Sequence, residues 1–230
     1  MTEKKQQRVC IIGAGISGMA AAWELAKHGV QVDVYEREKT LGGLAGWFTV
    51  GNTTVEKFYH HLYNLDVDLI QLITEAGLGD EIVFRQTNTG AFYVNKIYRL
   101  STPIDLLKYK PLPFLDRIRM GLLVLKARQV KDWKELDRIS AADWIIKKSS
   151  QKVFDVVWEP LFRSKFGRYA REVSAAWLWS KLVQRGGSRS KGGAEELGYL
   201  RGGYGLLFEK LEKGLADRGV RIFKGAPVEA

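Results

Sequence analysis

The residues most able to do chemistry lie near the start of the chain, where glycines and one carboxylate recur at set distances. Gly13, Gly15 and Gly18 form a G-x-G-x-x-G sequence directly after an apolar run at 8–12, and Glu36 follows further on. This spacing is typical of a loop that binds the diphosphate of a dinucleotide at a helix N-terminus. A lone G-x-G-x-x-G is a weak signal, but a strand, the glycines, a helix and a carboxylate in this order are specific.

Each residue of this loop has a physical role in such a site. We expect Gly13 to permit the tight turn, Gly15 to let the backbone approach the diphosphate, and Gly18 to let the helix pack closely on the strand. Unpaired N–H groups and the positive end of the helix dipole would hold the diphosphate. Glu36 would accept hydrogen bonds from the adenosine ribose, and its charge disfavours the 2′-phosphate of NADP. The expected cofactor-binding residues of the loop are Gly13, Ala14, Gly15, Ile16, Ser17 and Gly18.

A second glycine pair, Gly42-Gly43, favours FAD over NAD as the cofactor. Two flexible backbone positions shortly after the ribose-binding carboxylate would let a second loop close over the diphosphate and the flavin side. A simple NAD dehydrogenase has no need for that loop. The cofactor contacts expected from this part of the chain are Glu36, Arg37, Gly42, Gly43, Leu44 and Ala45.

The elements that must position these residues alternate between strand and helix. The apolar run at 8–12 predicts a buried strand, in which Cys10 would be a small buried residue. A helical spacing over 14–27 and a second strand at 31–36 follow, so the two strands are expected to be parallel. Residues 82–100 are expected to form further strands with turns at Asn88-Thr89-Gly90 and Asn95-Lys96.

The rest of the chain is mainly helical and then returns to strand. Helical patterns run from about residue 101 to 183, a Gly/Ser-rich loop expected to be mobile covers 185–198, and a helix at 204–217 precedes a strand at 220–223. PVEA at 227–230 predicts the start of another strand, from which we expect a C-terminally incomplete chain.

These elements predict an α/β fold in two parts. Residues 1–100 and 198–230 would form a Rossmann-like FAD-binding domain, and residues 101–197 an inserted, mainly helical substrate-binding domain.

Composition excludes several classes of protein. Three histidines and one cysteine exclude a disulfide framework and a Cys-rich zinc site, and no metal is expected. The charged start has no apolar signal-peptide region, and no apolar stretch is long enough to cross a bilayer. We expect a cytoplasmic protein that does not cross a membrane.

The net charge of +10 attracts anions, but it is spread through the middle of the chain between apolar residues. One interpretation is a set of solvated helix faces. The other is a surface that rests peripherally on a membrane. Nucleic acid is not expected as a partner, because no recognition module is visible.

Two features of the helical segment have ordinary structural explanations. Five tryptophans, at 133, 144, 158, 177 and 179, are typical of core packing, and the alternative is an aromatic pocket for a bulky apolar substrate. Glu159 and Arg163 predict an ion pair without a catalytic role.

Segment 9–46 resembles the FAD-binding signature of the flavin amine oxidase superfamily, which includes protoporphyrinogen oxidases and phytoene desaturases. In that family an arginine often follows the double glycine, whereas here Leu44 takes its place. The likeness extends more loosely to 55–61 and to 201–205 with the helix after it. The resemblance implies that 55–61 enters the flavin site and that Val228 lies near the adenine through its backbone.

His60 and His61, within that entering stretch, are the candidates for a catalytic role. Adjacent residues of a strand point to opposite faces, so at most one of the two would face a flavin. The alternative is that both are hydrogen-bonded structural histidines.

The resemblance implies an FAD-dependent oxidoreductase that takes a hydride from a small apolar substrate onto the flavin, and nothing in the sequence names its electron acceptor. One alternative is a non-redox flavoenzyme of the UDP-galactopyranose mutase type, which the basic middle segment would suit. The other is an inactive truncated half that needs a partner segment.

Overall fold

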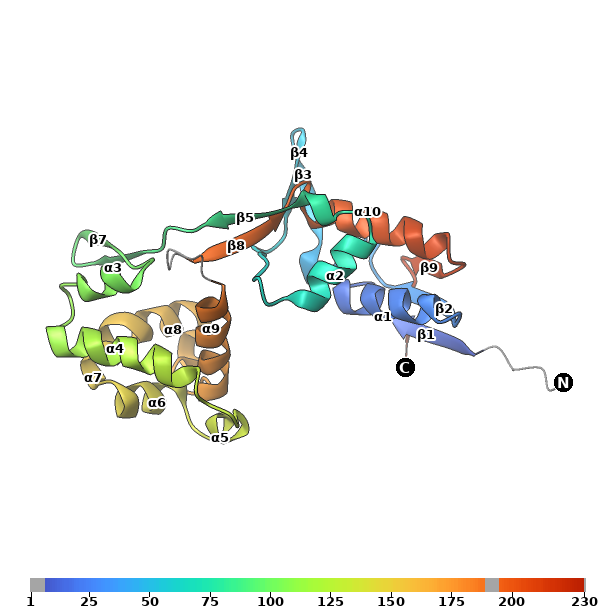
Figure 1. Ribbon diagram of the computed structural model, residues 1–230. Coiled ribbons are helices and arrows are strands. Elements are labelled where there is room, and N and C mark those ends of the chain that lie inside the picture. The colour runs from blue at the N-terminus through green and yellow to red at the C-terminus, as the bar shows by residue number, and fades with distance from the viewer. Residues whose placement is uncertain (1–6, 189–194, 230) are drawn as a thin grey trace. The chain divides into compact units, whose positions relative to one another are not determined.

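The computed structural model of the chain describes residues 7–188 and 195–229 (Figure 1). The chain divides into two units. Unit 1 consists of Met1–Leu62, Asp66–Phe84 and Gly198–Ala230, and unit 2 of Tyr63–Leu65 and Arg85–Leu197. The boundary expected after residue 100 therefore falls inside unit 2.

Unit 1 contains a parallel sheet, a hairpin and three longer helices. Its elements are β1 (Arg8–Ile12), α1 (Ile16–Lys27), β2 (Gln31–Glu36), η1 (Gly43–Ala45), β3 (Trp47–Val50), β4 (Thr53–Glu56), α2 (Val67–Glu75), η2 (Gly79–Glu81), α10 (Gly203–Ala216) and β9 (Arg221–Lys224). Two strands, β5 (Ile82–Gln86) and β8 (Glu196–Leu200), pair with each other where the chain leaves unit 1 and returns to it.

The parallel sheet has the strand order β1-β2-β9, so that the second strand of the chain lies in the centre. Val9 pairs with Val32, and Val34 pairs with Ile222. The expected strand–helix–strand unit at the start of the chain is confirmed, because β1 and β2 are parallel and α1 connects them. This arrangement brings the C-terminal ends of β1 and β2 to one edge of the sheet, which is where ligands bind in such folds.

A core of buried apolar side chains joins the helices of unit 1 to the sheet. Met19 and Val34 are fully buried, as are Leu207 and Leu211 of α10. Glu75 of α2 ties the helices together further, because it accepts a hydrogen bond of 2.8 Å from Trp23 Nε1. These contacts fix α1, and therefore its N-terminus, relative to the strands.

Two expectations for unit 1 are wrong. Cys10 is exposed, and Ile12 in the same strand is 70% exposed. The reason is that β1 lies at the edge of a three-stranded sheet, and α1 and α10 both pack on the side of the sheet opposite to these two residues. The segment Ala226–Glu229 is not a strand, since the described chain leaves the sheet after Lys224.

Unit 2 is a helical body with one hairpin. Its elements are β6 (Gly90–Tyr93), β7 (Lys96–Arg99), α3 (Pro103–Leu107), α4 (Phe114–Ala127), α5 (Lys134–Asp137), α6 (Ala141–Lys148), α7 (Gln151–Val153), η3 (Phe154–Trp158), α8 (Glu159–Phe166), η4 (Gly167–Tyr169) and α9 (Ala175–Gly187).

An aromatic cluster forms much of the core of unit 2. Phe162 is fully buried, and its ring lies about 6 Å from those of Phe154, Trp158, Phe166 and Trp177. Core packing thus accounts for most of the tryptophans, whereas Trp133 is 46% exposed. The five residues of η3 form a π-helix. Its wide turn has a physical cause in Pro160, which has no N–H to donate to the preceding turn.

The β6–β7 hairpin turns one residue earlier than expected. Tyr93 pairs with Lys96, so the two loop residues are Val94 and Asn95 rather than Asn95 and Lys96. Both loop residues have positive φ angles, 45° and 58°. Such a turn suits Asn or Gly, and a β-branched valine in it is strained.

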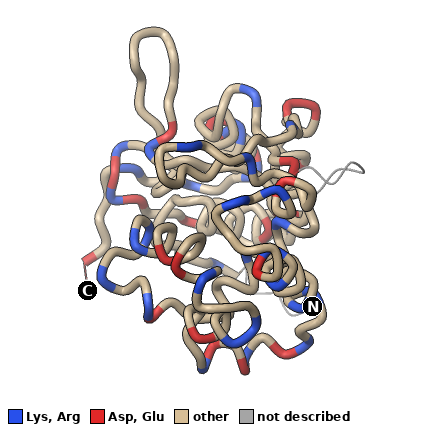
Figure 2. The backbone as a smooth tube through the Cα atoms, turned by 90° about the vertical axis from the view of Figure 1, so that its left-hand side faces the viewer, with Lys and Arg blue, Asp and Glu red and all other residues tan. Residues whose placement is uncertain are grey.

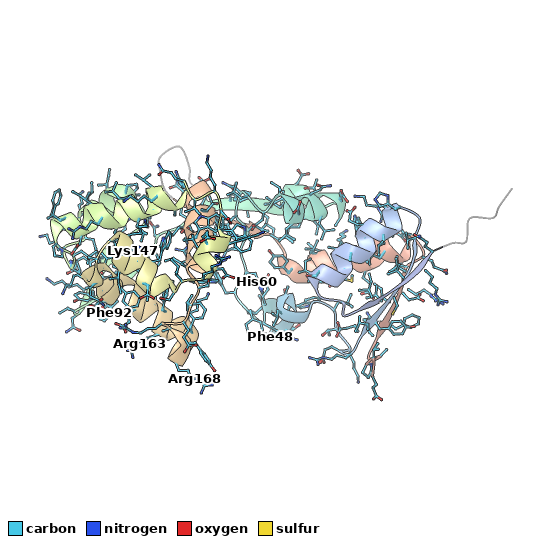
Figure 3. All side chains as sticks on the ribbon, turned by 90° about the horizontal axis from the view of Figure 1, so that it is seen from below. Phe48, His60, Phe92, Lys147, Arg163 and Arg168 are labelled. Carbon is cyan, nitrogen blue, oxygen red and sulfur yellow. The ribbon has the colours of Figure 1, made fainter. Side chains whose placement is uncertain are left out.

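Lys, Arg, Asp and Glu occur in many parts of the described chain (Figure 2). The expected ion pair between Glu159 and Arg163 is confirmed at 3.2 Å, and Arg171 joins it at 3.1 Å. Arg163 lies at the periphery of its unit (Figure 3). Of the loop expected at 185–198, residues 189–194 lie outside the described residues.

Candidate functional site

The two glycine-rich loops meet at the edge of the sheet in unit 1. Gly42 N donates a hydrogen bond of 3.0 Å to Ala14 O, and Gly15 and Gly42 form a parallel backbone bridge. Gly42 has a φ of 110°, and a Cβ there would lie 2.8 Å from Gly46 Cα. The turn of the second loop therefore needs glycine at this position.

Gly18 is required by the folded chain itself. A Cβ at this position would lie 2.0 Å from Gly13 O and 3.3 Å from Ile11 Cγ2. Gly18 lies in the first turn of α1, so the close approach of that helix to the end of β1 depends on the missing side chain. This is the role that the sequence predicts for the third glycine of the loop.

Gly15 presents the opposite case, because no described part of the chain requires a glycine there. Its φ of −72° is ordinary for any residue, and the nearest heavy atom to a Cβ would be Gly42 O at 4.0 Å. The space in front of this residue is open. A glycine that the described fold does not need is consistent with a ligand that passes close to the backbone.

The N-terminus of α1 begins at this same residue. Within the described residues no side chain caps the helix, and its first turn contains no acidic residue. The N–H groups of a first helical turn have no acceptor inside the helix. Ile16, Ser17 and Gly18 therefore present amide groups and the positive end of the helix dipole, which together suit a diphosphate.

Glu36, at the end of β2, is held in place by main-chain hydrogen bonds. It is 7% exposed, and its two carboxylate oxygens accept bonds from Ala14 N at 2.7 Å and from Glu38 N at 2.9 Å. Ala14, which is fully buried, thus links the glycine loop to the carboxylate. Each carboxylate oxygen can accept a further hydrogen bond, which leaves capacity for a ribose hydroxyl.

The end of the described chain runs beside Glu36. Ala226 N donates a hydrogen bond of 2.9 Å to Glu36 O, and Val228 follows two residues later with 49% exposure. The backbone contact of Val228 to an adenine stays a prediction. No local pattern in the sequence indicates the hydrogen bond from Ala226, since nearly two hundred residues separate its partners.

The remaining residues expected in the second loop differ in their exposure. Ala45 is buried, whereas Leu44 is 73% exposed. Arg37 is also exposed, and its Nε lies 3.5 Å from Glu38 Oε1. The side chains of Arg37 and Leu44 are accessible to a ligand, whereas that of Ala45 packs inside the protein.

His60 and His61 do not lie on a strand, because β4 ends at Glu56. The two histidines were expected to point to opposite faces of a strand, and this expectation is wrong because they are not on a strand. Their rings nevertheless have different neighbours. His60 Nδ1 lies 2.7 Å from Phe58 O, and its ring meets the edge of Tyr204 at 5.8 Å. His61 lies 5.0 Å from the ring of Tyr59. Figure 3 marks His60.

A carboxylate that sequence reasoning missed lies at the N-terminus of α10. Glu56 Oε1 accepts a hydrogen bond of 3.0 Å from Tyr204 N, and both line a cavity of about 450 Å³ with Trp47. A Cβ at Gly205 would lie 3.0 Å from Trp47 Cε2, which explains the glycine there. Burial and the charge of Glu56 raise the pKa of Tyr204 to about 12.

The described residues contain no group of three His, Cys, Asp or Glu side chains placed to hold a metal ion. None of their helices combines the length and the apolar character needed to cross a bilayer.

Curated relatives are similar in sequence to a large part of this chain. A carotenoid phi-ring synthase of Streptomyces griseus is 33% identical over 198 residues, which cover 74% of this chain and 37% of that protein. A mitochondrial protoporphyrinogen oxidase of Nicotiana tabacum is 27% identical over 70% of this chain and 33% of its own length. The chain thus spans about a third of the length of these relatives.

Solved structures share the fold. Cyclohexylamine oxidase of Brevibacterium oxydans superposes with a TM-score of 0.70 at 23% identity, over 97% of this chain and 52% of that chain. An oxidoreductase of Methanosarcina mazei gives a TM-score of 0.69 at 19% identity, over 95% of this chain and 51% of that one. The mixed α/β fold with a parallel sheet is therefore one that oxidoreductases use.

The family model described as flavin containing amine oxidoreductase matches residues 16–230. This match covers most of the chain, from the N-terminus of α1 onward, and FAD is the cofactor that it implies. The open α1 N-terminus, the unobstructed Gly15 and the anchored Glu36 suit the adenosine diphosphate half of that cofactor. The chain belongs to the flavin containing amine oxidoreductase family.

Proposed function

We propose that the chain is the FAD-binding and substrate-binding part of an FAD-dependent oxidoreductase. Unit 1 would act as a Rossmann-like cofactor domain, and unit 2 as a helical substrate domain inserted into it. The observation that carries the proposal is Gly15, whose missing side chain serves no described part of the protein and leaves the α1 N-terminus open.

Different residues of unit 1 would bind different parts of the cofactor. The amides of Ile16, Ser17 and Gly18 bind the diphosphate, and Glu36 orients the adenosine ribose through its hydroxyls. Gly42 and Gly43 let the second loop lie against the first, so that the diphosphate is enclosed by main chain. When bound, FAD supplies the redox step by accepting a hydride.

The substrate class proposed is a small apolar molecule. The support comes from the names of the relatives, which act on carotenoids or on protoporphyrinogen. One of the two histidines, His60 or His61, would orient the substrate or polarise the flavin. His60 is partly exposed beside Tyr204.

Cofactor binding is the first test. The chain is titrated with FAD while flavin fluorescence and absorbance are followed, and Gly15→Leu is the matched control. The proposal predicts saturable binding that the leucine variant loses while its circular dichroism stays unchanged. Equal binding by both proteins would contradict the proposed seat of the diphosphate.

Turnover is the second test and separates the alternatives. The FAD-loaded protein is mixed without oxygen with a carotenoid precursor, a porphyrinogen, an aliphatic amine or a UDP-sugar. Bleaching of the flavin by one of the first two supports the proposed substrate class. Bleaching by the amine alone contradicts that class. Isomerisation of the UDP-sugar by protein whose flavin has first been reduced chemically would instead establish the mutase type.

A further inference from the structure

Helix α4 carries a line of apolar side chains on its solvent-facing side. Phe114, Leu115, Ile118, Leu122 and Leu125 follow one another at intervals of three or four residues apart from the first pair, and each is between 38% and 64% exposed. Residues at this spacing lie on one face of a helix. We call these five residues the α4 stripe.

The α4 stripe is not the face by which the helix joins its core. Leu123 and Ala127, on the opposite side, are fully buried, and Ala127 O accepts a hydrogen bond of 2.8 Å from Trp179 Nε1. A surface helix normally presents polar residues to water, so a continuous apolar face marks an interaction surface.

The short helix α3 extends the apolar surface. Ile104 and Leu107 are 62% and 47% exposed. Helix α3 packs on α4 through Leu106, whose Cδ2 would lie 3.8 Å from a Cβ at Gly121. The exposed apolar side chains of the two helices therefore belong to one neighbourhood of unit 2.

Positive charge surrounds this surface. Residues 101–131 contain seven Lys or Arg against two Asp, a net +5 that is half of the +10 of the whole chain. Both acids are already engaged: Asp105 caps α3, and Asp116 is 7% exposed and binds Arg119 at 3.1 Å.

The cations flank the α4 stripe on both sides. At 100° per residue, Arg119 and Lys126 lie next to one edge of the stripe, and Arg117 and Arg128 lie next to the other. Arg117 donates to Leu107 O and Leu112 O, and Arg128 to Gly186 O, so these two are partly held by the protein. No ion pair is recorded for Lys126 among the described residues.

We propose that α3 and α4 dock unit 2 on an anionic membrane surface. Apolar side chains on one helix face with Lys and Arg along its edges are the pattern of a helix that lies in the lipid interface. The stripe would enter the boundary of the acyl chains while the flanking cations meet the headgroups. The positive charge favours an anionic lipid surface over an apolar protein partner, because an apolar partner would not require cations along both edges of the stripe. The inference is independent of the proposed function, since it concerns binding without cofactor or substrate.

Sedimentation with lipid vesicles tests the proposal. The chain is mixed with vesicles of phosphatidylcholine alone or with added phosphatidylserine, and the bound fraction is measured as lipid concentration rises. We expect binding to the anionic vesicles that weakens with salt. Lys108→Gln/Lys126→Gln should lower the partition coefficient about five-fold for each lysine. Ile118→Ala/Leu122→Ala should lower it roughly ten-fold or more.

Matched controls lie elsewhere in unit 2. Leu161, which is 50% exposed in α8, and the exposed Lys147 of α6 (Figure 3) are changed to Ala and Gln. These variants should bind as the unchanged chain does. No binding to either vesicle, or equal losses in stripe and control variants, would overturn the proposal, as would stripe variants that alter only the oligomeric state in size-exclusion chromatography.

A label on the stripe gives a second readout. Cys10 is the one cysteine of the chain and is exposed in unit 1, so Cys10→Ser allows a single thiol to be introduced at Leu122. An environment-sensitive dye there should shift its emission to the blue with anionic vesicles, whereas the same dye at Leu161 should not. Equal emission from both sites would contradict insertion of the stripe even if the protein sediments.

Discussion

Replacing Gly15 with alanine adds one methyl group at the N-terminus of α1. The backbone there already has a φ of −72°, and the new Cβ would be 4.0 Å from its nearest described neighbour, Gly42 O. Alanine loses less conformational entropy on folding than glycine does, by about 0.4–1 kcal/mol. Gly15 is also the N-cap of α1, where glycine is preferred to alanine, so the two effects largely offset each other. We therefore expect Gly15→Ala to change the Tm of the cofactor-free protein by no more than about 2 °C.

The same methyl group would stand where the diphosphate is proposed to lie. If it displaces one charge-assisted hydrogen bond, worth about 1.5–3 kcal/mol, FAD affinity should fall by roughly ten-fold or more. Thermal unfolding followed by circular dichroism measures the first effect, and a fluorescence titration with FAD measures the second.

Gly18→Ala is the matched comparison. Its Cβ would lie 2.0 Å from Gly13 O, a backbone atom, so the turn between β1 and α1 must move. We expect a loss of stability of about 3 kcal/mol, together with a loss of binding. A Gly15→Ala protein as destabilised as Gly18→Ala, or one that binds FAD as well as the unchanged chain, would refute the distinction between a glycine kept for the fold and one kept for the ligand.

Three further outcomes are expected. Glu36→Ala leaves the buried amide of Ala14 without its acceptor, so urea unfolding should show a loss of about 1–3 kcal/mol, with weaker FAD binding, and Glu36→Gln should retain more of both. Hydrogen bonds from Arg221 and Arg8 lower the pKa of Asp33 to about 2, below the unfolded value of about 3.9. Its contribution to stability is therefore present above about pH 4 and lost as the pH falls toward 2, and Asp33→Asn should flatten the stability curve in that range. Val94→Asn, which relieves a β-branched residue at positive φ, should stabilise the hairpin by about 1 kcal/mol, measured as a rise in Tm.

Local spacing was sufficient to predict the strand–helix–strand unit that contains the proposed cofactor site. The three glycines of the first loop, the helix after them and Glu36 at the end of the second strand occupy the positions that their order in the chain requires. These predictions succeed because each depends on a short segment, and a parallel strand–helix–strand unit has one favoured hand.

Local sequence patterns could not predict the contacts between segments that are distant in the sequence. The exposure of Cys10 depends on which face of the sheet is covered, and α10, about two hundred residues later, packs on the opposite face. The bond between Glu56 and Tyr204 likewise joins segments 148 residues apart. The stretch that contains His60 has a strand-like local sequence. Between Glu56 and α2, however, the described chain forms one isolated bridge, from Leu62 to Gly198, and no strand.

The central claim is that unit 1 holds the adenosine diphosphate of FAD between the α1 N-terminus and Glu36. A displacement titration tests it most directly: FAD-loaded chain is mixed with ADP, with ADP that carries a 2′-phosphate, or with FMN, and release of flavin is followed by fluorescence. We expect ADP to displace FAD and FMN to have little effect. The 2′-phosphate should weaken displacement by ADP about ten-fold or more, because Glu36 repels it. Displacement by FMN but not by ADP, or equal potency of the two adenine nucleotides, would contradict it.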